Sequence, residues 1–442
     1  MSTRLLCVGD IHLGRRPSRI ASGLSEYGLD SAALGPTAAW RNAVAWALTH
    51  NVDAVVLAGD VVDRNDDRFE AYGHLENGVR RLIEAGLVVC GVAGNHDVEA
   101  LPRLADRISD FHLLGAGGCW QALEVAAAGG EPGLRVLGWS FPSVPFRDNP
   151  LDSLEFGFDD SLPTIGILHC DLEAGASAYA PVRRAQLEST GADAWLLGHV
   201  HKPGALSGPR PIGYLGSLVG LDPGEPGPHG PWLAEVGGRR DVRMTPVAAA
   251  PLRWESIEID VAHFDAVESG QRQDRLAAAI VEGFQHLHKR LGEAVSGTSA
   301  VGCRVRLYGR ARCHRELRSA LENSGLSEQC RVCDEVVYFV ESIRDDAAPL
   351  LDLDELAKSG DPPGLLARRL LALTSDDAEA QAWIGDAQRR LRTVLERGSA
   401  WRVLDPRRLE NSDTRSLLLR AGMEVLEEML AQDSDRGRGT EL

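Results

Sequence analysis

Short apolar runs alternate with helical patterns through the first half of the chain. Apolar positions at helical spacing predict helices over residues 37–50 and 71–86, and the second of these ends at a glycine. Alternation of this kind is typical of α/β layers around a largely buried sheet. Glycine-rich turns and short β-like runs between residues 115 and 140 predict a hairpin region with mixed strand pairing. Five apolar runs have the character of buried strands, and they cover residues 5–10, 53–60, 87–97, 164–171 and 193–201.

The pattern changes in the second half. Residues 204–231 are rich in glycine and proline, which predicts a segment that is mostly loop. A helical pattern over 274–291 and strand patterns over 300–310 and 336–343, with another helix between the strands, predict a second and smaller α/β domain. Beyond this domain the apolar positions again follow helical spacing.

The length of 442 residues suits two or three domains. We expect an α/β domain over 1–245, a smaller one over 250–345 and a helical region over 346–442. The polar tail from residue 433, DSDRGRGTEL, is expected to be disordered. The apolar faces of the C-terminal helices have two interpretations: they dock a partner or a second copy, or they pack on one another.

Side chains that bind metals stand at the end of each of the five strand-like runs. The motifs are GDIHLG, GDVVD, GNHD, LHCD and GHVH. In layered α/β proteins ligands bind at the carboxyl ends of the strands, so five strands bring these side chains to one rim. Turn chemistry would explain a single motif of this kind, but five in one half of the chain favour a metal site. The candidate ligands are Asp10, His12, Asp60, Asn95, His169, His199 and His201.

The mixture of oxygen and nitrogen ligands indicates two divalent metal ions. Imidazole argues against calcium or magnesium alone, and the absence of thiolate ligands argues against structural zinc. Manganese is therefore the first expectation, with iron or magnesium as alternatives. Asp60 is the candidate bridge, because one carboxylate can hold two cations about 3.5–4 Å apart. Two divalent cations against two ligating aspartates leave a site near plus two, which attracts phosphate.

The GNHD motif divides its roles among neighbouring residues. Asn95 offers a neutral carbonyl oxygen, which binds a metal without cancelling its charge. His96 follows on a tight turn and points elsewhere, so it is the candidate catalytic residue, as a general acid or as a stabiliser of phosphate charge. Asp97 and Asp63 are expected to orient neighbouring groups without binding metal.

The chain is acidic, with 47 basic and 64 acidic side chains and a net charge of −17. It therefore does not bind nucleic acid through its overall field, and contact with DNA needs local cations or bound metal. The alternative for local arginines is a solvated loop that balances the acidic surface. The candidates for DNA contact are Arg15, Arg16, Arg19, Arg183, Arg184 and Lys202.

The eight cysteines do not form a recognisable disulfide framework. Four lie in or beside strand-like runs, where a reduced thiol acts as a small apolar side chain. CRVC at 330–333 invites a zinc interpretation, but its spacing fits no common finger. No signal peptide and no membrane-spanning stretch are recognisable, so we expect a cytoplasmic protein that does not bind membranes.

The ordered set of five motifs resembles the calcineurin-like metallophosphoesterase superfamily, and more closely its DNA repair exonucleases of the SbcD and YhaO type. Further stretches that resemble this branch are YAPV at 179–182, the loop at 214–230 and the segment at 251–260. Leu215 stands where the family's loop usually has a proline. The resemblance covers about residues 1–345.

The resemblance implies a four-layer α/β/β/α metallophosphoesterase domain, a smaller α/β capping domain and a helical C-terminus. It implies a two-metal phosphodiesterase acting on DNA, an exo- or endonuclease subunit of a repair or defence complex, with His96 as the catalytic histidine. A metal-bound hydroxide would attack phosphorus in line. The resemblance assigns one manganese to Asp10, His12, Asp60 and His201, and the other to Asp60, Asn95, His169 and His199.

Partners also follow from the resemblance. Family members work with an SMC-like coiled-coil ATPase and as homodimers, and this chain has no Walker A motif of its own. Two alternatives stay open at this point: a phosphoesterase on a substrate other than DNA, such as a phosphatase or cyclic-nucleotide phosphodiesterase, or a scaffold subunit of an ATPase complex.

Overall fold

The computed structural model describes residues 2–64, 68–126, 132–158, 161–323, 325–375, 378–397 and 411–438. The chain forms two compact units whose segments interleave. Unit 1 comprises residues 1–257, 281–304 and 327–342, and unit 2 comprises residues 258–280, 305–326 and 343–442. The division into three consecutive domains stays a prediction. No helix within the described residues is long and apolar enough to cross a membrane.

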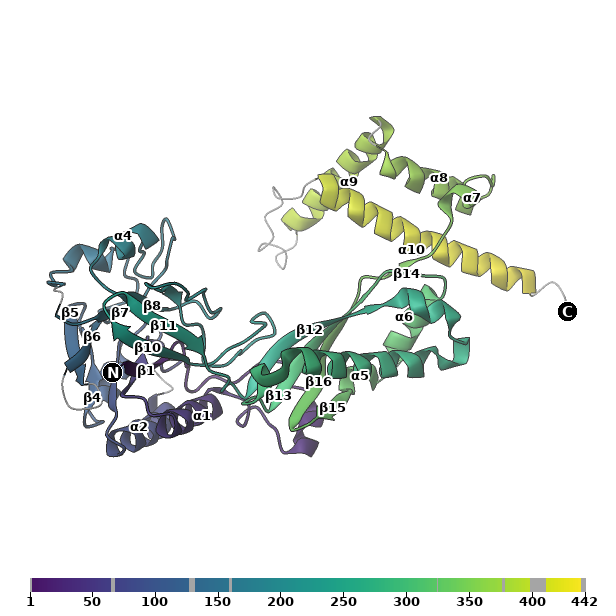
Figure 1. Ribbon diagram of the computed structural model, residues 1–442. Coiled ribbons are helices and arrows are strands. Elements are labelled where there is room, and N and C mark those ends of the chain that lie inside the picture. Colours follow the sequence, from purple (N-terminus) through teal and green to yellow (C-terminus); the bar gives the residue numbers. More distant parts are fainter. Residues whose placement is uncertain are drawn as a thin grey trace. The chain divides into compact units, whose positions relative to one another are not determined.

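Two β-sheets form the N-terminal part of unit 1 (Figure 1). The first has six strands in the spatial order β11 (Asp241–Pro246), β10 (Trp232–Gly238), β1 (Thr3–Val8), β2 (Ala54–Leu57), β3 (Val88–Gly91) and β4 (Phe111–Leu113). The second has five strands in the order β5 (Trp120–Ala126), β6 (Pro132–Trp139), β7 (Thr164–His169), β8 (Ala194–Gly198) and β9 (Ile212–Tyr214). β5 and β6 form an antiparallel hairpin, and pairing from β6 to β9 is parallel. The predicted hairpin with mixed pairing is confirmed.

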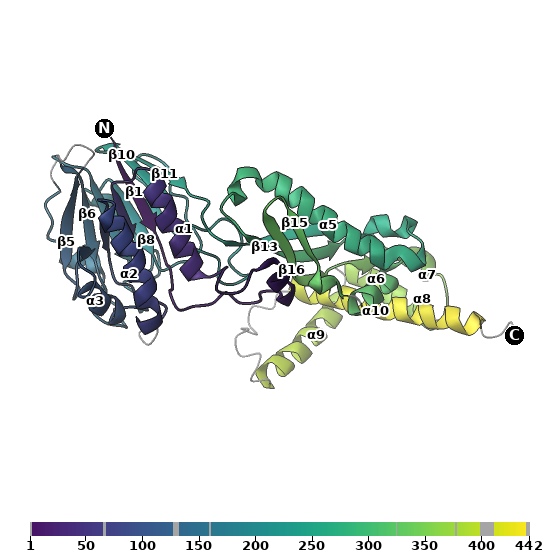
Figure 2. The same ribbon diagram turned by 90° about the horizontal axis from the view of Figure 1, so that it is seen from below.

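Both faces of the sheets are buried along the central strands β1, β2, β3, β7 and β8, which explains why these strands read as continuous apolar runs. In β1, Leu6 and Val8 pack with the helices α1 (Pro36–Thr49), α2 (Arg68–Glu84) and α3 (Ala100–Ala105). Figure 2 shows α1 and α2 side by side against this sheet. The alternate residues Leu5 and Cys7 pack against the second sheet. The outer face of that sheet, with Trp195, packs on α4 (Arg184–Ser189). The predicted α/β/β/α layers are confirmed.

A third sheet has four strands in the order β12 (Leu252–Asp260), β13 (Ala300–Tyr308), β16 (Val336–Asp345) and β15 (Cys330–Cys333). The helices α5 (Arg272–Leu291) and α6 (His314–Asn323) have the places that the sequence predicts. A small parallel pair joins β14 (Arg310–Ala311) to β17 (Ala348–Pro349). The segment 204–231 is loop apart from β9, much as its composition predicts.

The C-terminal region is helical, as predicted. Its helices are α7 (Leu353–Leu356), α8 (Pro362–Thr374), α9 (Ala378–Arg397) and α10 (Asn411–Arg438). Leu370, Ile384 and Leu426 form its apolar core. The last helix, α10, is assigned as far as Arg438, and disorder of the tail from residue 433 stays a prediction. Residues 439–442 lie outside the described part.

Candidate metal centre

The seven predicted ligands lie together at the carboxyl ends of β1, β2, β3, β7 and β8. The loops after β1 and β2 are held to each other, since the backbone N–H groups of Ile11 and His12 both donate to the Asp60 carbonyl, at 3.0 and 2.9 Å. Three of the ligands have backbone dihedrals in the left-handed range: φ is 55° at His12, 48° at Asp60 and 106° at His199. Such conformations are costly for residues other than glycine and collect at functional sites.

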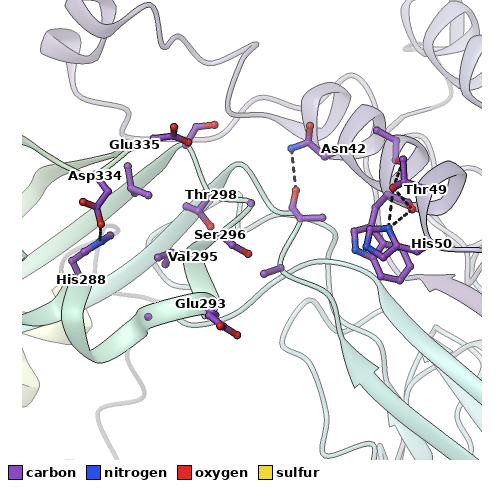
Figure 3. A pocket seen from close by; sticks show the side chains of 18 residues that line it. Asn42, Thr49, His50, His288, Glu293, Val295, Ser296, Thr298, Asp334 and Glu335 are labelled. Atoms are coloured by element: carbon purple, nitrogen blue, oxygen red, sulfur yellow. Dashed lines mark hydrogen bonds and ion pairs between the residues drawn. The ribbon is translucent and has the colours of Figure 1, made fainter.

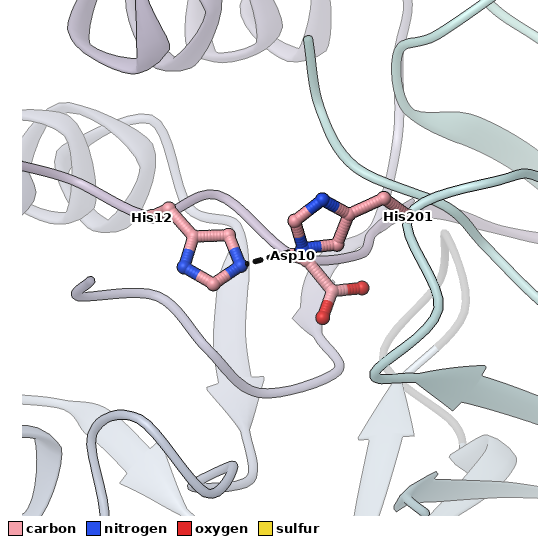
Figure 4. A group of neighbouring side chains, drawn as sticks. All are labelled: Asp10, His12 and His201. Atoms are coloured by element: carbon pink, nitrogen blue, oxygen red, sulfur yellow. Dashed lines mark hydrogen bonds between the residues drawn. The ribbon is translucent and has the colours of Figure 1, made fainter. Parts of the chain in front are cut away.

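The first group of ligands contains Asp10, His12 and His201 (Figure 4). The Nε2 atoms of the two histidines face each other at 2.9 Å. Asp10 is fully buried, and its Oδ2 has no hydrogen-bond partner among the described residues. A buried carboxylate oxygen without a partner is expensive unless a cation accompanies it. The three side chains therefore fit a divalent metal ion.

The second group lies around Asp60, whose Oδ2 is 3.3 Å from His169 Nε2. The Oδ1 atom of Asn95 is 3.0 Å from both His169 Nε2 and His199 Nδ1. His169 Nδ1 lies 3.0 Å from the Ala58 carbonyl oxygen, which suits a proton on that nitrogen and a lone pair on Nε2. Asp60 is also near the first group, at 4.0 Å from His12 Nε2. Its position between the groups suits a bridging carboxylate.

The charges of the two groups are coupled. Burial opposes the charged form of Asp60, but His169, His12 and His96 together hold the pKa of its carboxyl below the usual range. For His169 burial also opposes the charged form, which lowers the pKa of the imidazole. The nearby carboxylates of Asp60 and Asp10 outweigh this effect and raise the pKa to about 9. Without metal, a proton on the His169 imidazole therefore supplies part of the positive charge that metal ions would bring to the centre. Metal ions and protons compete for the same imidazole nitrogens.

Carboxylates and carbonyl oxygens surround the ligands on their outer side. Asp63 Oδ1 is 3.0 Å from His12 Nδ1, close enough for an ion pair but without hydrogen-bond geometry. Asp97 contacts backbone: its two oxygens accept from the N–H groups of Val61, Val62 and Gly94 at 2.7, 3.2 and 2.8 Å. It thus holds the loops that carry Asp60 and Asn95.

Two further carboxylates, which the sequence interpretation missed, face the histidines of GHVH. Asp171 Oδ1 is 3.4 Å from His199 Nε2, and Glu225 Oε1 is 2.7 Å from His201 Nδ1. Asp171 is the last residue of LHCD, so that motif contained a signal for it. Glu225 lies in the loop at 214–230 that resembles the family's loop, but its spacing does not indicate which histidine it faces.

His96 differs from the other histidines of the metal centre because its side chain is exposed. Its Nδ1 is 2.7 Å from the Asp63 carbonyl oxygen, and its backbone N–H donates to Asp60 Oδ1 at 2.9 Å. A proton on Nδ1 leaves Nε2 available to the solvent side of the centre. The His96 and His12 rings are 5.0 Å apart and perpendicular. His96 is therefore beside the ligands and open to a substrate.

The candidate DNA contacts differ in their surroundings. Arg15 is half-buried beside the centre, 4.0 Å from Asp63 Oδ1. Arg19 pairs with Glu341 at 2.8 Å, so its guanidinium already has a carboxylate partner. The remaining candidates are exposed, and they are Arg16, Arg183, Arg184 and Lys202.

A cleft of about 1050 Å³ lies elsewhere in unit 1 (Figure 3). Its walls include Asn42 of α1, His50 directly after that helix, His288 of α5, and Glu293 and Asp334. None of the candidate metal ligands lines it. The cleft therefore does not contain the metal centre.

Comparison with known proteins agrees with the site. Residues 3–203 match the family described as calcineurin-like phosphoesterase. This matched segment resembles a calcineurin-like phosphoesterase domain. The matched family consists of phosphoesterases, and the grouped side chains make this a candidate dimetal site.

Two curated proteins are similar to this chain. The "uncharacterized metallophosphoesterase YhaO" of Bacillus subtilis is 28% identical over 240 residues, which are 50% of this chain and 54% of that protein. The "DNA double-strand break repair protein Mre11" of Aeropyrum pernix is 28% identical over 292 residues, 61% of this chain and 68% of that protein. The chain thus spans about half of the first relative and two thirds of the second. A solved dimetal phosphatase from Danio rerio aligns with 55% of this chain and 98% of its own, at 14% identity and a TM-score of 0.35, and adds nothing to this assignment.

Proposed function

We propose that this protein hydrolyses phosphodiester bonds in DNA with two divalent cations, manganese in the first place. The observation that carries the proposal is the grouping of seven oxygen and nitrogen ligands beside one exposed histidine, His96. The similarity to a DNA double-strand break repair protein over 68% of its length favours DNA as the substrate. Iron and magnesium are the alternatives to manganese at the same ligands, and metal supply also affects which ion is bound.

The ligands would divide between two cations that share Asp60. Asp10, His12 and His201 complete one set, and Asn95, His169 and His199 complete the other. When bound, the cations would supply positive charge for the phosphate and activate water. His96 Nε2 faces the open side, where it can donate a proton to the leaving oxygen. Arg15, next to the centre, would bind a neighbouring phosphate of the strand.

A partner ATPase and a homodimer belong to the same proposal. The helical region of unit 2 exposes Leu365 on α8 and Leu417 and Val425 on α10, at 52%, 43% and 53% of their surface. Apolar side chains of this size, exposed on helices, suit docking of an SMC-like coiled-coil ATPase. The proposed complex would work in the cytoplasm, in repair or defence.

The test is cleavage of an end-labelled linear DNA duplex by the purified chain with manganese, beside the His96→Ala variant. A bis-nitrophenyl phosphate assay runs in parallel, and bound manganese is counted in both proteins. We expect DNA loss that needs manganese and that His96→Ala reduces by at least about 100-fold while both metals stay bound.

Three other results would change the proposal. Turnover of the small diester without DNA cleavage would leave a working phosphoesterase with another substrate. Full activity of His96→Ala would remove its catalytic role. Absence of turnover on both substrates, with two metals bound, would favour a scaffold whose partner does the chemistry.

A further inference from the structure

The two histidines of GHVH present different ring nitrogens to the metal centre. His199 turns Nδ1 inward, 3.0 Å from Asn95 Oδ1, and His201 turns Nε2 inward, 2.9 Å from His12 Nε2. The outward nitrogens are then Nε2 of His199 and Nδ1 of His201. Each of these faces a carboxylate from a different loop: Glu225 is hydrogen-bonded to His201 at 2.7 Å, and Asp171 is within ion-pair distance of His199 at 3.4 Å.

A neutral imidazole carries one proton, and a carboxylate on one nitrogen fixes it there. The other nitrogen then keeps its lone pair for a metal. His199 and His201 are only two residues apart, yet one turns Nδ1 inward and the other Nε2. The backbone that they share therefore does not explain why their tautomers differ. The choice depends on what stands behind each ring.

Asp171 is itself held in place. Its second oxygen accepts a hydrogen bond from Ser177 Oγ. The Tyr214 hydroxyl accepts from the Leu172 N–H at 2.7 Å and donates to the Cys170 carbonyl at 3.2 Å. One phenol thus ties both chain neighbours of Asp171 to β9. The carboxylate is therefore presented to His199 by a fixed loop.

Glu225 is fixed by a separate set of bonds. Its Oε2 accepts from the Leu221 N–H at 2.8 Å, which leaves Oε1 for His201. The buried His229 lies with Nε2 3.1 Å from the Glu225 carbonyl oxygen and Nδ1 2.9 Å from Ser217 Oγ. Both side chains at the contact, Glu225 and His201, are about four fifths buried. The loop 217–229 therefore forms a support for His201.

We propose that Asp171 and Glu225 are positioning residues, each of which sets the tautomer and ring orientation of one GHVH histidine and so the affinity of one of the two metal sites. Asp171 acts on the site that contains His199, and Glu225 on the site that contains His201. This inference rests on the proposed metal chemistry, but it does not depend on DNA being the substrate.

Two matched pairs of variants of the full chain test it. Asp171→Asn is compared with Glu173→Gln, which removes a carboxylate two residues away whose Oε1 accepts from the Arg184 N–H. Glu225→Gln is compared with Asp222→Asn in the same loop, whose carboxylate bonds Ser18 and Gly224. Manganese binding is measured by titration calorimetry. The electron paramagnetic resonance signal of the coupled manganese pair reports whether both sites are filled.

We expect each positioning variant to weaken one of the two manganese sites by roughly 10–100-fold, as loss of an outer carboxylate partner of a metal-ligating histidine typically does. The coupled-pair signal should disappear at metal concentrations that saturate the wild type. The melting temperature of the metal-free protein should stay within a few degrees of the wild type, which separates positioning from support of the fold. The variants Glu173→Gln and Asp222→Asn should bind both ions normally.

Manganese affinities within twofold of the wild type in both positioning variants would overturn the inference, and so would equal losses in the control variants. Failure of the proposed function would give results that differ from failure of this inference. A wild type that binds no manganese has no such centre, whereas one that binds two ions without cleaving DNA contradicts only the substrate. The Asp171 and Glu225 comparison remains decisive in the second case.

Discussion

Asp97 connects the two loops that carry the central ligands, and its removal gives a quantitative test of the site's construction. The side chain is fully buried and accepts three backbone hydrogen bonds, from Val61, Val62 and Gly94. In Asp97→Ala all three N–H groups lose their acceptor in a place that water does not reach. The loops after β2 and β3 would no longer be tied together beside Asp60.

The size of the effect follows from those contacts. A hydrogen bond to a charged acceptor contributes about 1.5–3 kcal/mol, so three would sum to roughly 4.5–9 kcal/mol if they were independent. Burial and the Asp60 charge raise the pKa of Asp97 to about 7, so the cost of burying the charge offsets part of this sum. We expect Asp97→Ala to lower the free energy of unfolding by about 3–4 kcal/mol.

Urea unfolding of the metal-free protein, followed by tryptophan fluorescence, measures this loss without interference from metal binding. Asp193→Ala is the matched control. Asp193 is equally buried and also accepts three hydrogen bonds, from the Thr164 and Arg240 N–H groups, both at 2.8 Å, and from Arg239 Nε at 3.1 Å. It precedes β8, at the end of the strand away from the ligands. Both variants should lose comparable stability, and only Asp97→Ala should also lose manganese affinity.

A loss below about 1 kcal/mol in Asp97→Ala would refute the reasoning, because it would mean that the three N–H groups find other acceptors. Normal manganese binding in a clearly destabilised Asp97→Ala variant would refute the claim that Asp97, by tying the two loops together, places Asp60 and Asn95 for metal binding. Asp97→Asn keeps one acceptor oxygen, so its loss should be about half that of the alanine variant.

Three other changes test neighbouring features. Gly94→Ala would place a methyl group against Asp60 Oδ1 and its backbone nitrogen, so calorimetry should show loss of manganese binding and assays loss of turnover. Chelation should lower the melting temperature, because free manganese at 100 times its dissociation constant stabilises the native state by about 2.7 kcal/mol; equal melting curves with and without chelator would contradict a metal centre. Leu426→Ala removes a fully buried side chain from the C-terminal core and should cost about 2–5 kcal/mol by urea unfolding without changing manganese affinity.

The sequence predicts the seven ligands because their positions depend on a simple rule. Each ends an apolar run, and parallel strands bring their carboxyl ends to one edge. The structure places all seven at that edge, each within about 4 Å of another candidate ligand. Glu225 obeys no such rule. It reaches His201 through a loop without regular structure, and the path of such a loop depends on bonds such as the one to Leu221.

The interleaving of the two units was also beyond the sequence patterns. Periodicity identifies α5, β13 and β16 as elements but carries no information about which contacts their two halves make. Each of these elements contributes one part to unit 1 and the other to unit 2.

The outer carboxylates change the charge argument made from the sequence. Two divalent cations against Asp10 and Asp60 would leave plus two, but Asp63, Asp171 and Glu225 add three negative charges behind the histidine rings. The sum is then 4 − 2 − 3, or −1, so net charge does not draw phosphate to the centre. The positions of the charges attract phosphate instead, because the three carboxylates lie on the outer side of the histidine rings. The exposed His96 and the half-buried Arg15 lie on the open side. Attraction of an anionic substrate to this acidic protein should therefore depend on these two side chains as well as on the metals.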